Sequence, residues 1–166
     1  MDRLQRFRDA QAQVGVGWAA AMSQLRAGSK RGHWIWYVFP QLAGLGHSAM
    51  SQHFGIDGRA EAEAYLADDQ LRTRLEEAMA IVAEHAGGPG HARLDVLMGS
   101  AVDTAKLISS LTLFEAVGGG LCRAGDRRAA RLVELAGVVL VAAGDQGYPR
   151  CAFTTEALAG RAVRPS

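Results

Sequence analysis

Apolar residues recur along most of the chain at intervals of three and four positions, the spacing of one face of an α-helix. Long stretches with this pattern cover residues 2–27, 70–88, 104–117 and 126–144, and shorter ones cover 49–54, 57–69 and 92–99. Short connections marked by glycine separate them, without an internal repeat. The pattern predicts a mostly α protein, a compact single-domain bundle of about five to seven helices with at most a minor strand component.

Residues that favour helix ends indicate where these helices begin and stop. Side chains able to accept hydrogen bonds from free N–H groups stand at the expected starts, namely Asp2, Ser48, Asp68 or Asp69, Asp103 and Asp126. Glycines stand at the expected ends, at Gly28, Gly87–Gly88 and Gly118–Gly120. Gly15 and Gly17 lie inside the first stretch. We expect a kink there, because each glycine costs a helix about 1 kcal/mol relative to alanine.

The segment at residues 28–48 departs from the helical pattern. It reads GSKRGHWIWYVFPQLAGLGHS and places a group of aromatic residues after a basic pair. Its β-branched and aromatic residues favour a short strand, but short apolar runs also occur as buried helical turns. The pattern leaves both structures open. It also leaves open whether the segment fills the core or forms one wall of a binding site.

The composition is that of a globular protein, since 49% of the 166 residues are hydrophobic and 21% are charged. Eighteen Lys and Arg against seventeen Asp and Glu give a net charge of +1, which argues against bulk electrostatic binding of nucleic acid. The N-terminus is charged, unlike a signal peptide, and no apolar run reaches the roughly 20 residues of a membrane span. We expect a soluble cytoplasmic protein with no membrane contact. It would have one domain at residues 1–160 and a frayed tail at 161–166.

Motifs for common cofactors and metals are missing from the sequence. GxGxxG and GxxxxGK[ST] are both absent, so no cofactor is expected. HExxH is absent and the five histidines do not pair at ligand spacing, so no metal is expected. No GxSxG elbow marks a serine nucleophile. Cys122 and Cys151 form no CxxC pair, and we expect both to be reduced, inert thiols.

Two clusters of residues nevertheless have the chemistry of a ligand site. The first comprises Lys30, Arg31, His33, Trp34 and Trp36. Trp and Arg stack on flat rings, and Lys and Arg hold phosphate. A site of this kind suits a nucleotide-like or ribosyl ligand. The alternative is that the tryptophans fill the core while the two cations are solvated.

The second cluster lies in DTAKLISSLTLFE, residues 103–115. On a helix, Asp103, Lys106 and Ser110 share one side at intervals of three and four. Lys106 stands alone between apolar residues, a setting in which a lysine is often used to bind an anion. The alternative is a helix cap with an exposed ion pair, which contributes only a few tenths of a kcal/mol.

Both clusters belong to longer motifs that resemble those of a known family. The motifs are LQRFRDAQ, LRAGSKRGHWIWYVFPQLAGLGHS, EAEAYLADDQLRTRL and DTAKLISSLTLFEA, and together they span residues 4–116. They are similar to the bacterial and fungal family catalogued as domain of unknown function 1810, some members of which carry a calpastatin label. The resemblance implies a mainly α-helical fold.

The chain departs from that family's pattern at three places. Gly32 stands where a serine is expected beside His33, and Asp68 and Asp69 stand where His-Pro is usual. Ile108 replaces an arginine that often precedes the two serines, so a contact to a ligand anion would be lost here if that arginine makes one. The family also has a distant likeness to NADAR-type proteins, which act on ADP-ribosyl groups. That likeness is an analogy of size, helical fold and aromatic motif.

We therefore expect a small intracellular enzyme that acts on a ribosyl or nucleotide-like, ADP-ribose-type small molecule, with N-glycosidic bond cleavage as the candidate reaction. The expected catalytic residues are His33 for proton transfer and Asp103 and Glu115 for stabilising an oxocarbenium-like state. The expected ligand-binding residues are Lys30, Arg31, Trp34, Trp36, Gln41, Lys106, Ser109 and Ser110. Two alternatives remain open. One is a non-catalytic module that binds such a ligand or a protein, and the other is a structural protein whose aromatic run forms core or a homodimer face.

Overall fold

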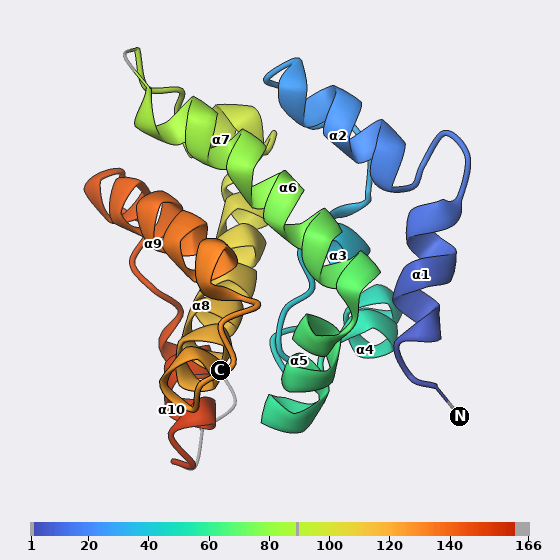
Figure 1. The fold of residues 1–166 in the computed structure, drawn as a ribbon. Helices are drawn as coiled ribbons and strands as arrows, with labels where there is room; N and C mark the ends of the chain where they lie inside the picture. The colour runs from blue at the N-terminus through green and yellow to red at the C-terminus, as the bar shows by residue number, and fades with distance from the viewer. Residues whose placement is uncertain (1, 89, 162–166) are drawn as a thin grey trace.

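The protein is described by a computed structural model at residues 2–88 and 90–161, which fold into ten helices without a strand (Figure 1). The helices are α1 (Gln5–Ala12), α2 (Trp18–Arg26), α3 (Ile35–Val38), α4 (Ala49–Phe54), α5 (Gly58–Ala67), α6 (Asp69–Gly87), α7 (Leu94–Leu97), α8 (Ala101–Arg123), α9 (Ala130–Asp145) and α10 (Ala152–Leu158). The predicted mostly α fold is confirmed. Strand-like pairing in the described residues is one parallel bridge between Leu42 and Ile56.

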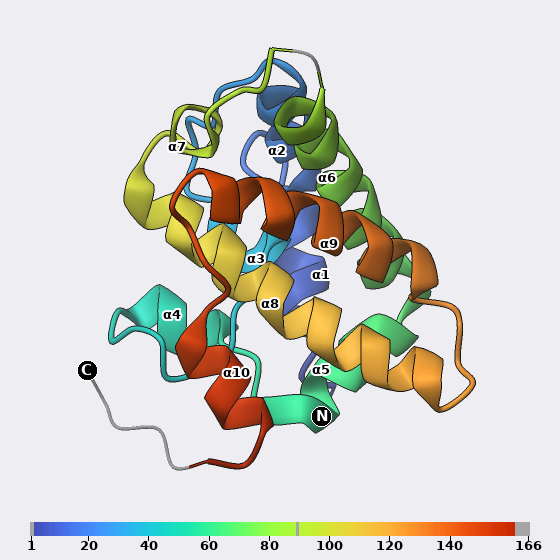
Figure 2. The same ribbon diagram turned by 90° about the vertical axis from the view of Figure 1, so that its left-hand side faces the viewer.

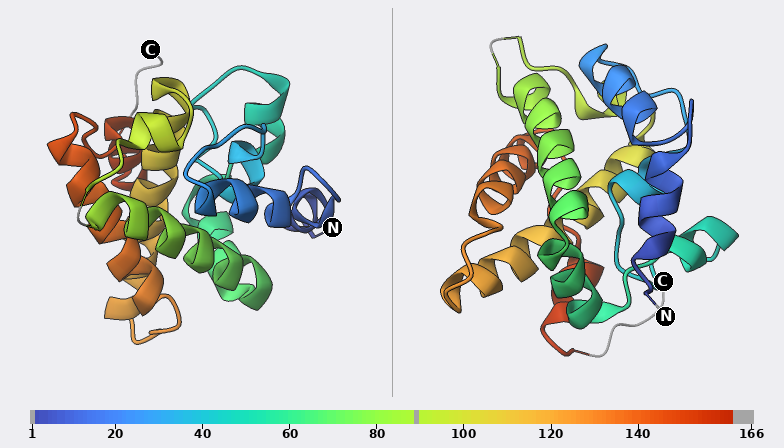
Figure 3. Two further views of the ribbon diagram at one scale, coloured as in Figure 1. Left: turned by 90° about the horizontal axis from the view of Figure 1, so that it is seen from above. Right: turned by 45° about the vertical axis from the view of Figure 1, so that its right-hand side comes forward.

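The longest helix, α8, forms the centre of the fold. It packs along α9 and also contacts α5, α7 and α10 (Figure 2). An 18-residue window of α8 has a mean hydropathy of 1.2, so by length and composition alone this helix could cross a membrane. However, 56% of that window is buried inside the fold, as expected of a core helix. On the other side of α9 lies α6, which separates it from α1 and α2 (Figure 3).

The single kinked helix predicted for residues 2–27 is two helices. The chain leaves the helix at Gln13 and re-enters it at Trp18, and Gly15 adopts a φ of +79° in between. A Cβ at Gly17 would lie 2.4 Å from the backbone oxygens of Gln11 and Gln13, so only glycine fits this tight reversal. The predicted stop at Gly28 is confirmed, because α2 ends at Arg26 and Gly28 has a φ of +79°.

The boundaries predicted for α8 are wrong at both ends. Ser100 rather than Asp103 caps the helix, because its hydroxyl accepts a hydrogen bond from the backbone N–H of Asp103. The helix also continues through Gly118–Gly120 to Arg123. Gly118 is buried where α8 crosses α9, and a Cβ there would lie 2.7 Å from Cγ2 of Val133. Close packing between the helices therefore overrides the low helix propensity of the three glycines.

The last part of the chain also differs from the prediction. Asp126 does not cap α9, which begins at Ala130, because its carboxylate binds Arg128 instead. After α9 the chain forms one more helix, α10, in the region for which the sequence pattern was ambiguous. Residues 162–166 of the tail expected to fray lie outside the described residues.

The aromatic segment is a short helix rather than a strand. Residues 35–38 form α3, and the side chains of Trp34, Tyr37 and Phe39 are buried in the core. Trp36 lies on the other side of this turn and is only half-buried. Some aromatic residues of the segment therefore fill the core, while the Trp36 ring remains partly exposed to solvent.

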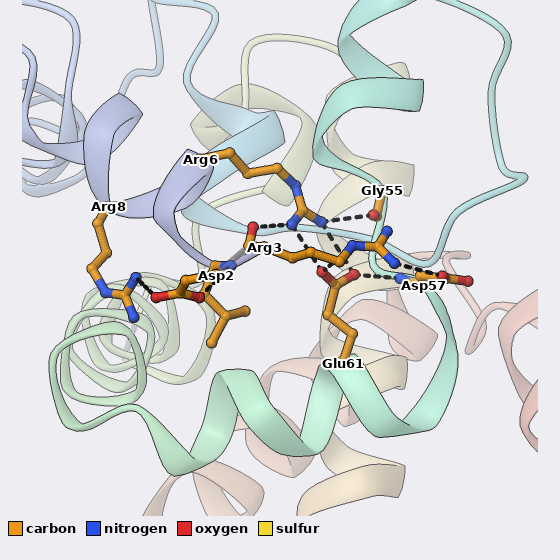
Figure 4. Close-up of polar contacts among 8 residues, drawn as sticks. Asp2, Arg3, Arg6, Arg8, Gly55, Asp57 and Glu61 are labelled. Atoms are coloured by element: carbon orange, nitrogen blue, oxygen red, sulfur yellow. Dashed lines mark hydrogen bonds and ion pairs between the residues drawn. The ribbon is translucent and has the colours of Figure 1, made fainter.

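A polar network joins α1 to the start of α5 (Figure 4). The guanidinium of Arg6 donates hydrogen bonds to both carboxylate oxygens of Glu61, at 2.8 and 3.1 Å, and to the carbonyl of Gly55. Burial opposes ionisation of Glu61, but hydrogen bonds from Arg6 and from the N–H of Asp57 bring its pKa below the ordinary value. The Arg6–Glu61 pair, whose side chains are 13% and 8% exposed, therefore links α1 to α5.

Candidate functional site

The two sequence clusters meet at the carboxylate of Asp103. The ammonium of Lys30 lies 2.7 Å from one of its oxygens, and the ammonium of Lys106 lies 3.1 Å from the other. Lys30 and Lys106 are the two lysines of the chain, whose other basic residues are arginines. The structure therefore gathers both lysines on one acid, which the sequence spacing did not require.

The helix α8 supplies Asp103 and Lys106 from successive turns. Because Ser100 fixes the first turn, Asp103, Lys106 and Ser109 follow one another along one side of the helix. The Lys30 backbone N–H donates to the carbonyl of Leu97, at 2.8 Å, just before α8 begins. This bond brings the loop after α2 against the start of α8, so the two lysines reach Asp103 from different elements.

A side chain that the sequence did not indicate holds the Lys30 loop in place. The side-chain oxygen of Gln24 accepts three hydrogen bonds, from the backbone N–H groups of Arg31 and Gly32 at 2.8 and 3.0 Å and from the indole N–H of Trp34 at 2.9 Å. Three donors meeting at one oxygen restrict the loop strongly. Lys30 also donates to the carbonyl of Gly32, which ties its ammonium group to the same loop.

Each lysine also lies near a tryptophan. The ammonium of Lys106 is 4.1 Å from the centre of the Trp36 ring, and that of Lys30 is 5.1 Å from the centre of the Trp34 ring. Both distances fall within the range of cation–π attraction. The Lys30 side chain is only 5% exposed, whereas that of Lys106 is 22% exposed. Lys106 is therefore the lysine that can contact a ligand.

A cavity of about 540 Å³ opens beside Lys106, and we call it the Lys106 cavity. It is lined by Trp36, Gln41, Leu45, Gly46, His47, Ser48, Val102, Ala105, Lys106 and Ser109. Small-molecule sites usually measure roughly 300–1,000 Å³, so this cavity has room for a nucleoside-sized ligand. Its walls come from α3, the loop before α4 and the first turns of α8. Most of the wall is apolar, with a few polar groups between.

Gln41 offers the cavity a buried polar group. The residue is 7% exposed, and among residues 2–88 and 90–161 its backbone carbonyl accepts a hydrogen bond from Ile56 while its side-chain amide makes none. Ser109 differs, because its hydroxyl donates to the carbonyl of Ala105 and keeps only its acceptor capacity. Its amide atoms are not among the described polar atoms that are buried without a partner, so they are accessible from the cavity. Gln41 can therefore donate or accept a hydrogen bond with a polar group in the cavity.

Asp103 is an ion-pair partner rather than a free acid. Burial opposes its ionisation, but hydrogen bonds from Lys30 and Lys106 bring the pKa of Asp103 below its ordinary value. Both carboxylate oxygens are occupied by ammonium groups. Its geometry therefore suits the task of fixing the two lysines.

Several residues expected at the site lie elsewhere. Arg31 and His33 are exposed and do not line the Lys106 cavity, and Trp34 is buried in the core. Ser110 is fully buried on α8, and its hydroxyl has no partner among the described residues. Glu115 binds Arg150 with two hydrogen bonds of 2.8 Å, away from the cavity. The structure thus brings together Lys30, Trp36, Gln41, Asp103, Lys106 and Ser109 from the expected set.

Sequence reasoning missed the loop that closes the cavity. Leu45, Gly46, His47 and Ser48 line it, yet their stretch was interpreted as a connection and a helix cap. The cap is real, because Ser48 accepts a hydrogen bond from the N–H of Ser51. The available signal was the position of His47 at the end of the same long motif as Trp36 and Gln41. Within the described chain, no three His, Cys, Asp or Glu residues group as a metal site would require.

Comparison with known proteins places these residues in a wider context. The model of a family described as "Protein of unknown function (DUF1810)" matches residues 1–123, which include every residue that lines the Lys106 cavity. Among solved structures, the conserved hypothetical protein Rv1873 from Mycobacterium tuberculosis is similar, with a TM-score of 0.70 and 34% sequence identity over 94% of this chain and 96% of that one. Among curated proteins, none matches.

Proposed function

The chain belongs to the DUF1810 family of proteins of unknown function, and from this premise we propose that it binds a small molecule in the Lys106 cavity. The ligand class is the ribosyl or nucleotide-like one expected from the sequence, a flat ring with an acidic group. Fold alone does not indicate function, so the proposal rests on the chemistry of the cavity.

One observation carries the proposal. Lys106 is fixed by Asp103 beside the half-buried ring of Trp36, and both side chains line one cavity of suitable size. An indole offers a stacking surface to a flat ring, and an ammonium binds an acidic group of the same molecule. The unpaired amide of Gln41 adds a neutral donor and acceptor that can orient the ligand.

Binding without turnover is the function that the cavity supports best. No carboxylate is among the described residues that line it, and Asp103 has both oxygens bound to lysines. Cleavage of a glycosidic bond usually employs carboxylates placed beside the scissile bond. The non-catalytic alternative is therefore favoured over the enzyme expected from the sequence.

Isothermal titration calorimetry with adenosine, AMP and ADP-ribose tests the proposal. We expect at least one of these ligands to bind, together with quenching of tryptophan fluorescence. Lys106→Met should weaken binding of the anionic ligands by about tenfold, since a charge-assisted hydrogen bond is worth about 1.5–3 kcal/mol. Arg26→Met is the matched control, because Arg26 is an exposed cation paired with Glu77, and neither residue lines the cavity. Absence of binding by all three ligands would refute the proposal.

A second candidate is hydrolysis of an N-glycosidic bond, favoured by one residue. His47 lines the cavity, and histidine is the side chain best suited to proton transfer near neutral pH. In this reaction water adds to the anomeric carbon, and the base leaves with a proton. Chromatography of the ligands after incubation tests it. Release of free base that is abolished in His47→Ala would establish catalysis. If the ligands remain intact, the second candidate is refuted and only the binding function stands.

A further inference from the structure

We propose that Asp103 is a specificity-determining residue that restricts the Lys106 cavity to ligands with one negative charge. The inference rests on the proposed function and deepens it. The ligand would carry a flat ring and a singly charged acidic group, such as a carboxylate or a phosphodiester. A phosphate monoester, which carries about two charges at neutral pH, would be a poorer fit.

The first argument is the charge held at the site. Two ammonium groups, Lys30 and Lys106, contact one carboxylate, Asp103, so two positive charges and one negative charge leave a net charge of +1. The other residue that lines the cavity and can carry charge is His47, which is exposed. No arginine is among the described residues of the lining. The site thus compensates one negative charge and holds no second cation for another.

The second argument concerns the hydrogen atoms of the lysines. The ammonium of Lys30 donates to Asp103 and to the carbonyl of Gly32, and its side chain is only 5% exposed. The ammonium of Lys106 has three hydrogens, of which one is directed to Asp103 while the group also lies against Trp36. At most two donors of Lys106 are then available to a ligand, enough for one acidic group.

The third argument is the surroundings of that donor. The remaining walls near Lys106 include Val102 and Ala105, which are apolar, and Gln41 and Ser109, which are neutral. A second negative charge in such a place has no partner and loses part of its hydration. The Asp103 carboxylate neutralises one of the two positive charges that Lys30 and Lys106 bring to the site. Selectivity against doubly charged ligands follows from this neutralisation.

A set of four proteins tests this charge count. The net charge of the site is +1 in the wild type. It is +2 in Asp103→Asn, because asparagine has the shape of aspartate without its negative charge. It is zero in Lys30→Met, since Asp103 then neutralises Lys106 alone. The double variant Lys30→Met/Asp103→Asn restores +1. Glu77→Gln is the matched control, because it removes an acidic charge of the exposed Arg26 pair, away from the cavity.

Calorimetry at about pH 8, where a phosphate monoester with a second pKa near 6 is fully ionised, gives the readout. The probes are adenosine, cyclic AMP and AMP, with charges of zero, one and two. Nicotinamide and nicotinate provide a carboxylate arm. For the wild type, the double variant and Glu77→Gln, we expect cyclic AMP to bind about tenfold tighter than adenosine and also tighter than AMP. Asp103→Asn should bind AMP about tenfold tighter than cyclic AMP, and Lys30→Met should not prefer anions.

The outcomes separate this inference from the function on which it rests. If no probe binds the wild type, both fail. If probes bind but the order of affinities is the same in all four proteins, or AMP binds the wild type at least as tightly as cyclic AMP does, the inference fails and the binding function stands. Circular dichroism of each variant establishes that it is folded. If Asp103→Asn alone does not fold, the double variant and Lys30→Met still decide between the two outcomes.

Discussion

The ammonium group of Lys106 lies 4.1 Å from the centre of the Trp36 ring, although the two residues belong to different sequence motifs. Asp103 holds the ammonium from one side, and the cavity opens beside it. A cation fixed next to an indole in this way is preorganised, so a ligand does not have to order it on binding. The following predictions test the parts of this arrangement one at a time.

Trp36 should contribute to affinity through its ring. Stacking of a base on an aromatic side chain is worth about 1–3 kcal/mol, so Trp36→Leu should weaken adenosine binding by about tenfold or more. Trp36→Phe keeps a ring and should remain within about threefold of the wild type. Calorimetry measures both affinities, with circular dichroism as the check on folding. Equal affinities for all three proteins would mean that the ligand does not stack on this residue.

Asp103 should stabilise the fold in a pH-dependent way. Its pKa is lowered in the folded protein, so its ion pairs stabilise the fold above the unfolded pKa of about 3.9. That contribution is lost as the pH falls through the lower, folded pKa. The difference in unfolding free energy between the wild type and Asp103→Asn should therefore be constant above about pH 5 and change steadily below it. Urea denaturation over a pH series measures it, and a flat difference throughout would contradict the ion pairs.

Gln24 should be needed for the position of the Lys30 loop. Gln24→Ala leaves three N–H donors without their acceptor, and each partly buried unsatisfied group costs about 1–3 kcal/mol, reduced here by access of water. We expect lower stability and weaker ligand binding together. Gln24→Glu keeps an oxygen acceptor at the same reach and should rescue both. Thermal unfolding and calorimetry provide the two measurements, and a neutral Gln24→Ala would exclude a positioning role.

Two neighbouring glycines of α8 should respond in opposite directions to the same change. A Cβ at Gly118 would lie 2.7 Å from Val133, so Gly118→Ala should destabilise the fold by about 1–3 kcal/mol. At Gly119 the nearest atom is the mobile end of Arg123 at 3.4 Å, and Gly119→Ala should stabilise the helix by up to about 1 kcal/mol. Chemical denaturation measures both. A similar effect of the two substitutions would contradict the tight α8–α9 crossing.

Helical periodicity predicted the local part of this structure well. It placed Asp103 and Lys106 one turn apart on α8, because that relationship depends only on residues close in the sequence. It failed at Gly118, where burial against Val133 decides in favour of helix despite poor propensity. It also gave Asp103 the role of a helix cap, whereas Ser100 caps the helix and frees Asp103 for the lysines.

The long-range part of the site was beyond the reach of periodicity. Lys30 reaches Asp103 because its backbone binds Leu97 and because Gln24 shapes the loop that follows. Both contacts join segments whose relative position only the packed core determines. His33, which follows this loop, is exposed and lies outside the cavity lining, whereas the lining includes His47.

The most direct test of the central claim uses the two lysines of the chain. In protein labelled with ¹³C only at lysine, NMR spectra contain side-chain signals from Lys30 and Lys106 alone, which Lys30→Met and Lys106→Met assign. Titration with cyclic AMP should move the Lys106 Cε signal along a saturating curve whose dissociation constant equals the calorimetric one. If cyclic AMP binds while both lysine signals stay unchanged, the ligand lies elsewhere and the Lys106 cavity is not its site.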